Sequence, residues 1–283
     1  MPTPFRDGEV DAAAIRANVR QWMAAGLGGI VALGTNGEAS LLDDAEGDLV
    51  VETARQEVPR DRTLIAGVGR ESTRATIAAA RRAAAGGADA VLVRTPSFYR
   101  AHVPVAALIA HYTAIADASP VPVLLYNYAA FTGVNMTPET IGRLAAHPNI
   151  AGIKETTTDG AQFAELAAVV PGRFTVLAGS APGAYTALCA GATGAILAVA
   201  CVRPQRCLRL RALAIEGRHA EALEAQQQLT PLARAVTTGF GIAGLKAAMD
   251  LSGLQGGDPR PPLGPLPSDA IEKIRSLLND TAD

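Results

Sequence analysis

Short apolar segments recur about every 30 residues along the first 200 residues of the chain. Each segment is rich in Val, Ile, Leu and Ala, ends in a Gly- or Thr-containing turn, and is followed by an Ala-rich amphipathic stretch. An apolar run without polar alternation is typical of a strand buried on both faces of a parallel sheet. The alternation therefore predicts an α/β fold with strands at 28–34, 63–69, 90–96, 121–127, 150–155, 174–180 and 194–200.

Helix signals lie between these segments and beyond them. Ser72 opens an Ala-rich stretch that closes on glycines, and Thr137 with Pro138 opens another, each as an N-cap. After residue 204 the strand pattern stops. The remaining sequence predicts three helices, over 205–229, 241–253 and 268–278.

We expect these elements to form one structural unit. Residues 1–204 would make a (β/α)8 TIM barrel, and 205–283 would add C-terminal helices that complete the barrel and pack against it. An eighth strand is due before residue 5, where only MPTPF is present, so the first strand is expected to be truncated. The open doubly wound sheet is the alternative fold. Nucleotide binding has no motif support, because no GxGxxG opens the first helix and GTNGE (34–38) lacks the GK[ST] of a P-loop.

Composition excludes several functional classes. The net charge is −2 with both signs mixed along the chain, so no basic stripe is available for nucleic acid. No apolar run approaches the roughly 20 residues of a membrane span, and the N-terminus lacks the pattern of a signal peptide. The three cysteines lack CxxC spacing and the four histidines are scattered, so no metal site is predicted. We expect a cytoplasmic protein.

Lys154 stands in an unusual place. Lysine contributes only three of the 25 Lys and Arg residues, and Lys154 ends the predicted buried strand 150–155. Burial disfavours the ammonium form and can lower the pKa of a lysine by up to about 3–5 units. A neutral lysine adds to ketones and forms a Schiff base. The alternative is a structural lysine paired with a carboxylate, for which Glu155 is the nearest candidate.

Other polar residues stand at the same ends of the predicted strands, where TIM-barrel active sites form. Tyr126 ends the strand before that of Lys154, so we expect the two side chains to face each other. A phenol can shuttle a proton beside a Schiff base. The turn 34–37 offers the Thr35 hydroxyl and backbone N–H groups to a carboxylate. Taken singly, Tyr126 could be a core residue and GTNGE an ordinary tight turn.

The order GTNGE, TPSFYR, LLYNYAAFTG and GIKETT resembles the class I pyruvate aldolases of the dihydrodipicolinate synthase and N-acetylneuraminate lyase superfamily, over essentially the whole chain. Several stretches are most similar to the 4-hydroxy-2-oxoglutarate aldolase branch. These are the asparagine in GTNGE, HYTAIADASPVPVLLY, HPNIAGIKE, VLAGSA, FGIAGLKAAMD and GGDPRPPL.

The resemblance implies roles for particular residues. Lys154 corresponds to the Schiff-base lysine and Tyr126 to the proton-relaying tyrosine. Thr35 corresponds to the relay partner that also binds the substrate carboxylate. Substrate-binding positions are implied for Asn36, Thr156, Gly179 and Ile196. Ser180, a polar residue at the end of the predicted strand 174–180, and Phe131 are expected near the far end of the substrate. No metal or organic cofactor is implied, because the iminium withdraws the electrons. The resemblance also implies a homo-oligomer, a dimer or tetramer.

Two positions depart from the family pattern. The synthases carry an arginine before the TG of the 131–133 loop to bind the distal carboxylate of their semialdehyde, and this chain has Phe131. A phenyl ring cannot bind a carboxylate, so the resemblance favours another substrate. Many relatives carry a tyrosine that reaches the neighbouring subunit's site where this chain has Phe98. Either the proton relay is shortened here or Tyr99 substitutes.

The sequence thus predicts a lyase that cleaves a 4-hydroxy-2-oxo acid of the 4-hydroxy-2-oxoglutarate type to pyruvate and an aldehyde such as glyoxylate. One alternative is an aldolase or dehydratase acting on a 2-keto-3-deoxy sugar acid. A second alternative is a non-catalytic relative that binds a 2-oxo acid.

Overall fold

The computed structural model describes residues 1–281 and contains a sheet whose strands follow one another in chain order. Parallel pairing is seen from β4 through β9, and every predicted strand is confirmed. The last strand is shorter than predicted, because Ala198–Cys201 forms a 3-10 turn. The strands are β3 (Gly29–Ala32), β4 (Thr63–Gly67), β5 (Ala90–Arg94), β6 (Val123–Asn127), β7 (Ile150–Glu155), β8 (Thr175–Ala178) and β9 (Gly194–Ala195).

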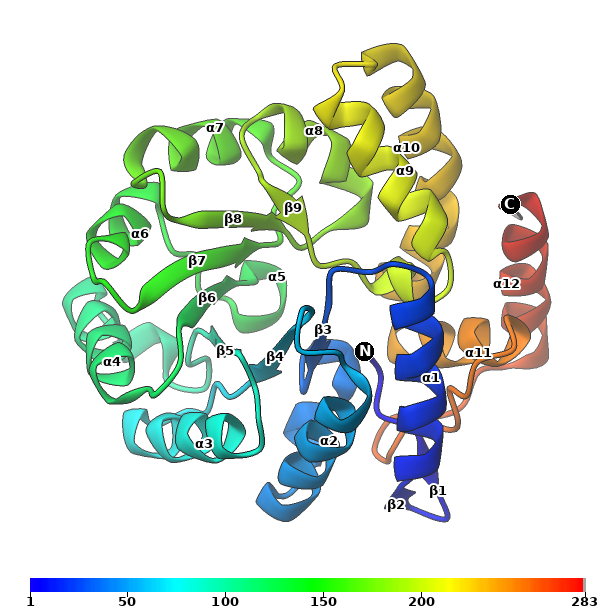
Figure 1. The fold of residues 1–283 in the computed structure, drawn as a ribbon, viewed down its shortest axis with the longest axis horizontal. Helices are drawn as coiled ribbons and strands as arrows, with labels where there is room; N and C mark the ends of the chain where they lie inside the picture. The colour runs from blue at the N-terminus through cyan, green and yellow to red at the C-terminus, as the bar shows by residue number, and fades with distance from the viewer. Residues whose placement is uncertain (282–283) are drawn as a thin grey trace. The chain divides into compact units, whose positions relative to one another are not determined.

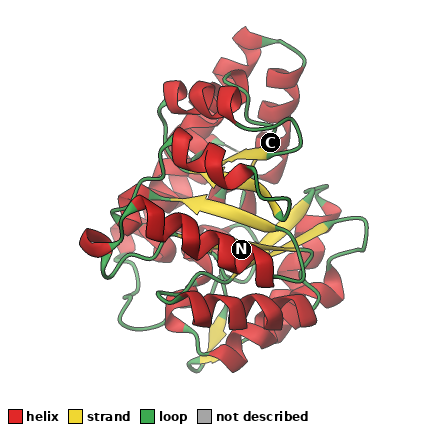
Figure 2. Cartoon of the chain, turned by 90° about the vertical axis from the view of Figure 1, so that its left-hand side faces the viewer, coloured by secondary structure: helices red, strands yellow, loops and turns green. Residues whose placement is uncertain are grey.

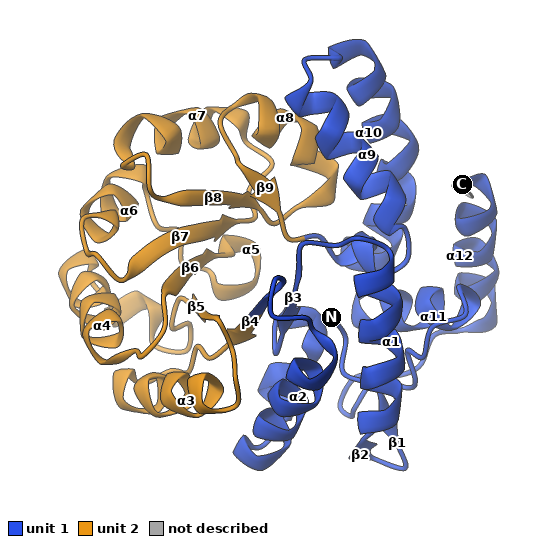
Figure 3. Cartoon of the chain, viewed as in Figure 1, with its two compact units in different colours: residues 1–64, 197–283 blue, residues 65–196 orange. Residues whose placement is uncertain are grey.

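The chain divides into two compact units, which Figure 3 colours separately. Unit 1 comprises residues 1–64 and 197–283, and unit 2 comprises residues 65–196. The sequence-based division at residue 204 stays a prediction, and its last two residues, 282 and 283, lie outside the described residues. Each unit is considered by itself below.

Unit 2 alternates strand and helix along the chain. Figure 2 colours the helices of the whole chain red and the strands yellow. Its helices α3, α4, α6 and α7 run along the outer side of strands β5–β8 in Figure 1. Ser72 caps α3, and Thr137 caps α6 with Pro138 at the first helical position, as predicted. The helices are α3 (Thr73–Ala85), α4 (Val105–Ala118), α5 (Ala129–Thr132), α6 (Pro138–Ala145), α7 (Gly160–Val169) and α8 (Ala184–Cys189).

Unit 1 contains a short antiparallel hairpin and the four α-helices described between residues 203 and 281. The helix predicted over 205–229 is wrong as a single element. Gly217 adopts a left-handed φ of 72°, and the Arg218 N–H donates to Leu213 O, so the chain turns and starts a second helix. The elements are β1 (Phe5–Arg6), β2 (Glu9–Val10), α1 (Ala12–Ala24), α2 (Asp44–Glu57), α9 (Pro204–Ile215), α10 (His219–Arg234), α11 (Gly241–Leu251) and α12 (Ser268–Asp280).

The segment before the hairpin lies at β3. The Met1 ammonium donates to Val31 O at 2.6 Å, and Thr3 Oγ1 donates to Gly37 O at 2.7 Å. Residues 1–4 form no strand of their own. An eighth sheet strand is therefore not seen among residues 1–281. Within the same described residues, no helix combines the length and apolarity needed to cross a membrane.

Candidate active site

Lys154 and Tyr126 lie opposite each other on neighbouring strands of unit 2. The register of β6 and β7 pairs Tyr126 with Lys154, as the sequence predicted. Lys154 Nζ lies 3.3 Å from Tyr126 Oη and 4.4 Å from the centre of the phenol ring. Lys154 is 8% exposed and Tyr126 5%. The pair is thus buried together at the carboxyl ends of its strands.

Burial lowers the pKa of Lys154 from its ordinary value of 10.5 to about 8. Among the described residues of unit 2, no carboxylate forms an ion pair with it. The alternative pairing with Glu155 is wrong, because the Glu155 carboxylate accepts hydrogen bonds from Asn127, Thr157 and Gln162 instead. At neutral pH about one Lys154 amine in ten is unprotonated, against about one in three thousand at the ordinary pKa. The amine is therefore poised for nucleophilic addition.

Gly179 leaves room for the lysine side chain. A Cβ at this position would overlap Thr156 Cγ2 and lie 3.0 Å from Lys154 Cε. Thr156 Oγ1 donates to Asn127 O at 2.5 Å, so its hydroxyl can only accept from a ligand. Ile196 N–H donates to Ala178 O at 2.8 Å, and Ser180 is half-buried at the start of the 3-10 turn η4 (Ala181–Gly183).

Aromatic rings continue outward from Tyr126. Tyr128 lies 5.8 Å from the Tyr126 ring, and Phe131 stacks on Tyr128 with ring centres 4.5 Å apart. Phe131 is 68% exposed. The sequence analysis did not identify Tyr128. Its position two residues after Tyr126 was the signal that could have identified it. Phe131 thus presents an exposed apolar ring next to Tyr128.

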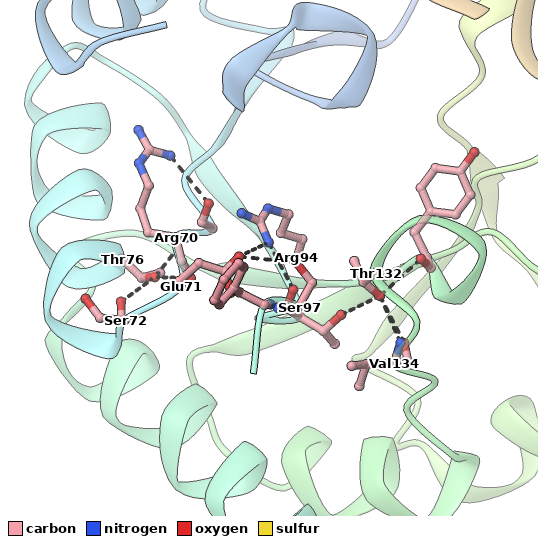
Figure 4. A network of polar contacts seen from close by, with 12 residues as sticks. Arg70, Glu71, Ser72, Thr76, Arg94, Ser97, Thr132 and Val134 are labelled. Carbon is pink, nitrogen blue, oxygen red and sulfur yellow. Dashed lines mark hydrogen bonds and ion pairs between the residues drawn. The ribbon is translucent and has the colours of Figure 1, made fainter. Parts of the chain in front are cut away.

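A polar network holds the loops that follow β4, β5 and β6 (Figure 4). The Glu71 carboxylate pairs with Arg94 at 2.9 Å and accepts the backbone N–H groups of Ser97 and Phe98 at 2.9 Å each. These hydrogen bonds lower the pKa of Glu71 to about 2, although its burial acts in the opposite direction. Arg94 is thus held in an ion pair.

A second contact in this network links the loops after β5 and β6. Thr95 Oγ1 donates to Thr132 Oγ1 at 2.9 Å, and both side chains are buried. The loop that carries Phe98 and the loop that carries Phe131 are therefore joined. Phe98 and Tyr99 themselves are 77% and 65% exposed.

The turn with Thr35 and Asn36 belongs to unit 1, where both residues are half-buried in the 3-10 turn η1 (Thr35–Gly37). Glu38 ends this turn with a left-handed φ of 55°, which is unfavourable for a residue with a Cβ. Its carboxylate is fixed on both oxygens, by Lys246 Nζ at 2.6 Å and by Arg260 N–H at 2.7 Å. The sequence reasoning missed this anchor, because Glu38 and Lys246 are far apart along the chain.

The geometry of unit 2 thus places a buried, partly neutral amine against a phenol, with no competing charge. Such an amine can form an iminium with a carbonyl carbon, and the phenol can exchange a proton with a group bound there. Among residues 1–281 no cluster of three or more His, Cys, Asp or Glu side chains could hold a metal ion.

Comparison with known proteins defines the class. Residues 1–281 match the dihydrodipicolinate synthetase family. The 4-hydroxy-tetrahydrodipicolinate synthase of Exiguobacterium sp. is 33% identical over 98% of this chain and 94% of its own length. The synthase of Pelobacter propionicus is 38% identical over 93% of this chain and 90% of its own length.

Solved structures of dihydrodipicolinate synthases also match this chain. A dihydrodipicolinate synthase of Bacillus anthracis matches with a TM-score of 0.96 and 26% identity over 100% of this chain and 97% of that one. The synthase of Acinetobacter baumannii, solved in complex with pyruvate, matches with a TM-score of 0.93 and 32% identity over 99% and 96%. The chain belongs to the dihydrodipicolinate synthetase family. It is thereby an enzyme of the pyruvate-dependent Schiff-base lyase and condensing class.

Proposed function

We propose that the protein is a class I aldolase that cleaves a 4-hydroxy-2-oxo acid of the 4-hydroxy-2-oxoglutarate type to pyruvate and an aldehyde such as glyoxylate. The observation that carries the proposal is the Lys154–Tyr126 pair, a buried amine 3.3 Å from a phenol. The branch rests on the sequence stretches named above and on Phe131 at the position where the synthases bind a distal carboxylate.

The reaction begins at the C2 ketone of the substrate. Lys154 Nζ attacks C2, water leaves, and an iminium forms. Tyr126 Oη takes the proton of the C4 hydroxyl while the C3–C4 bond breaks, and the bonding electrons move into the iminium to give an enamine. The aldehyde leaves, C3 is protonated, and water hydrolyses the iminium to release pyruvate and free Lys154.

The remaining site residues take binding roles in this proposal. Thr35 and Asn36 hold the substrate carboxylate, on the resemblance of GTNGE to the family's carboxylate-binding turn. Gly179 and Ile196 surround the pyruvyl half. Thr156, Ser180 and Phe131 meet the distal end.

The sheet arrangement is part of the same proposal. We infer that the strands close into a (β/α)8 barrel with a truncated first strand, supported by TM-scores of 0.92 and 0.96 to solved members of the family. A cytoplasmic location and assembly into a dimer or tetramer also stay proposals. Self-association is supported by the exposed rings of Phe98 and Tyr99, although one related synthase variant is described as monomeric.

A substrate panel tests the proposed reaction. Pyruvate release is measured with 4-hydroxy-2-oxoglutarate and with 2-keto-3-deoxy sugar acids, and Lys154→Ala is the control for background. We expect release from the first compound at least tenfold faster than from the others. Faster release from a sugar acid would favour the alternative aldolase. Pyruvate binding without turnover of any compound would favour a non-catalytic relative.

Condensation is the second candidate function, because the relatives are named 4-hydroxy-tetrahydrodipicolinate synthase. Consumption of pyruvate together with aspartate semialdehyde measures it. We expect little condensation in the natural protein and a gain in Phe131→Arg, which supplies the missing cation. Rapid condensation by the natural protein would contradict the proposed aldolase.

A further inference from the structure

We propose that Asn127 and Glu155 are a positioning pair, a buried amide–carboxylate contact that fixes the two strand ends carrying Tyr126 and Lys154. This role deepens the proposed Schiff-base reaction and rests on it. Neither side chain touches the reacting atoms in the proposed cycle.

The strand register places the two pairs on opposite faces of the sheet. Tyr126 pairs with Lys154, and the next residues along each strand, Asn127 and Glu155, pair with each other. Successive side chains in a strand point to opposite faces. The reactive pair on one face is therefore matched by the amide–carboxylate pair directly behind it.

The contacts of this pair are complete and buried. Asn127 Nδ2 donates to Glu155 Oε2 at 2.7 Å, and the two residues are 1% and 2% exposed. Glu155 also accepts from Thr157 N–H at 2.8 Å and from Gln162 Nε2 at 2.9 Å. The carboxylate thus meets three N–H donors and no cation. Only a group with acceptors on both oxygens satisfies all of them.

Asn127 connects this carboxylate to the loop after β6. Its Oδ1 accepts from Met136 N–H at 3.0 Å, and its Nδ2 also donates to Asn135 Oδ1 at 2.8 Å. Its backbone carbonyl accepts from Thr156 on β7's extension. Asn127 is therefore bonded to the strand that carries Lys154 through both its side chain and its main chain.

A buried carboxylate without a cation is costly, and burial raises the pKa of Glu155. A hydrophobic pair could fill the same volume, but it would not fix the direction of each strand end. The distance between Nζ and Oη depends on those directions. A displacement of about 1 Å at a catalytic group can lower a rate by about 100-fold.

Three variants test the pair. In Glu155→Gln, the new amide N–H₂ group faces at least one of the N–H groups that donated to the carboxylate, so two donors oppose each other. In Asn127→Asp, two carboxylates face each other. The double variant Asn127→Asp/Glu155→Gln restores one donor–acceptor contact, because the new amide donates to the new carboxylate, and the amides of Gln162 and Asn135 can turn over to match. The Met136 carbonyl, which accepts from Asn127 Nδ2 at 3.3 Å, loses this donor in both proteins that carry Asn127→Asp, so the recovery should be partial.

End-point trapping separates positioning from misfolding. Each protein is incubated with pyruvate and borohydride until labelling stops, and bound pyruvate per chain is counted by mass. Turnover is measured as pyruvate release from 4-hydroxy-2-oxoglutarate. We expect both single variants to trap close to one pyruvate per chain, to change KM by less than about threefold, and to lose about 10- to 100-fold in kcat. The double variant should regain at least tenfold over the poorer single variant.

Tyr112→Phe is the matched control. Tyr112 is fully buried in the same unit and donates to Val93 O at 3.2 Å. We expect its kcat to stay within about twofold of the natural protein.

Three results would overturn the positioning role: trapped pyruvate that falls in proportion to kcat, a kcat that does not change, or a double variant no better than either single one. Failure of the natural protein to trap pyruvate is a separate result, seen without any substitution. It would overturn the proposed function and the positioning role together.

Discussion

The two buried lysines of the chain, one in each compact unit, have different partners. Lys154 in unit 2 is 8% exposed and contacts the Tyr126 phenol. Lys246 in unit 1 is 1% exposed and lies 2.6 Å from the Glu38 carboxylate. Lys246 Nζ and Glu38 Oε1 form an ion pair but are not aligned for a hydrogen bond. Lys246 Nζ donates a hydrogen bond to Asp258 O at 2.8 Å.

The difference teaches what makes a lysine reactive. Burial lowers the pKa of both amines. At Lys246 the Glu38 carboxylate acts against this lowering of the pKa. At Lys154 no charge opposes burial, and the pKa falls to about 8. Burial without a counter-charge therefore favours the neutral, nucleophilic amine more than burial beside a carboxylate does.

Tyr126→Phe should have the largest effect among the substitutions that leave both lysines in place. General acid–base catalysis contributes about 10²- to 10⁴-fold, so we expect pyruvate release to fall by that factor. Pyruvate should still be trapped on Lys154, because the amine keeps its burial. Assays of both activities on one preparation measure this. Unchanged release would show that the phenol is only a core residue.

Lys246→Met should destabilise the protein strongly. It leaves the Glu38 carboxylate buried without its cation, which costs about 3–5 kcal/mol of unfolding free energy. Urea denaturation measures the loss. The control is Glu38→Gln/Lys246→Met, which removes both charges and should recover most of the stability. A loss below about 1 kcal/mol in the single variant would contradict a tight buried pair.

Lys154→Met should act in the opposite direction and stabilise the protein. A pKa lowered from 10.5 to about 8 corresponds to about 3 kcal/mol against folding, present in full below pH 8. Because the unfolded chain binds the proton more tightly, this cost fades as pH rises from 8 to 10.5. We expect a gain of about 1–3 kcal/mol at pH 7 that disappears near pH 10.5. A loss of stability at pH 7 would contradict the account.

The rate of pyruvate trapping should follow the neutral fraction of Lys154. Below pH 8 it should rise about tenfold per pH unit, and above pH 8 it should level off. Initial rates of adduct formation between pH 6 and pH 10 measure this profile. A trapping rate that keeps rising up to pH 10 would show that the pKa of Lys154 is close to the ordinary value for lysine.

The strands and helices of unit 2 were predicted well from the sequence, because the signals for a buried strand and for a helix start are both local. Apolar runs marked the strands, and Ser72 and Thr137 marked the starts of helices. The register of Tyr126 with Lys154 also followed, since consecutive parallel strands end at the same edge of a sheet. Gly217, a residue type that commonly ends helices, was the available signal for the break between α9 and α10. It lay within an otherwise continuous helical pattern, so a single helix was predicted.

Long-range partners could not be predicted. Glu38 and Lys246 come together only when the C-terminal helices fold back onto the N-terminal segment, and no periodicity relates the two positions. Glu155 was considered as a partner of Lys154 because it is adjacent in sequence. Adjacent residues of a strand point to opposite faces, and this rule directs Glu155 to Asn127 instead.

The most direct measurement is the location of the borohydride-trapped pyruvate. The natural protein, Lys154→Ala and Lys246→Arg are each treated with pyruvate and borohydride, digested and analysed by mass spectrometry. We predict one pyruvate per chain on the peptide containing Lys154, none on those containing Lys246 or Lys273, and no labelling of Lys154→Ala. Labelling at Lys246, or equal labelling of the natural protein and Lys154→Ala, would contradict the assignment of Lys154 as the nucleophile.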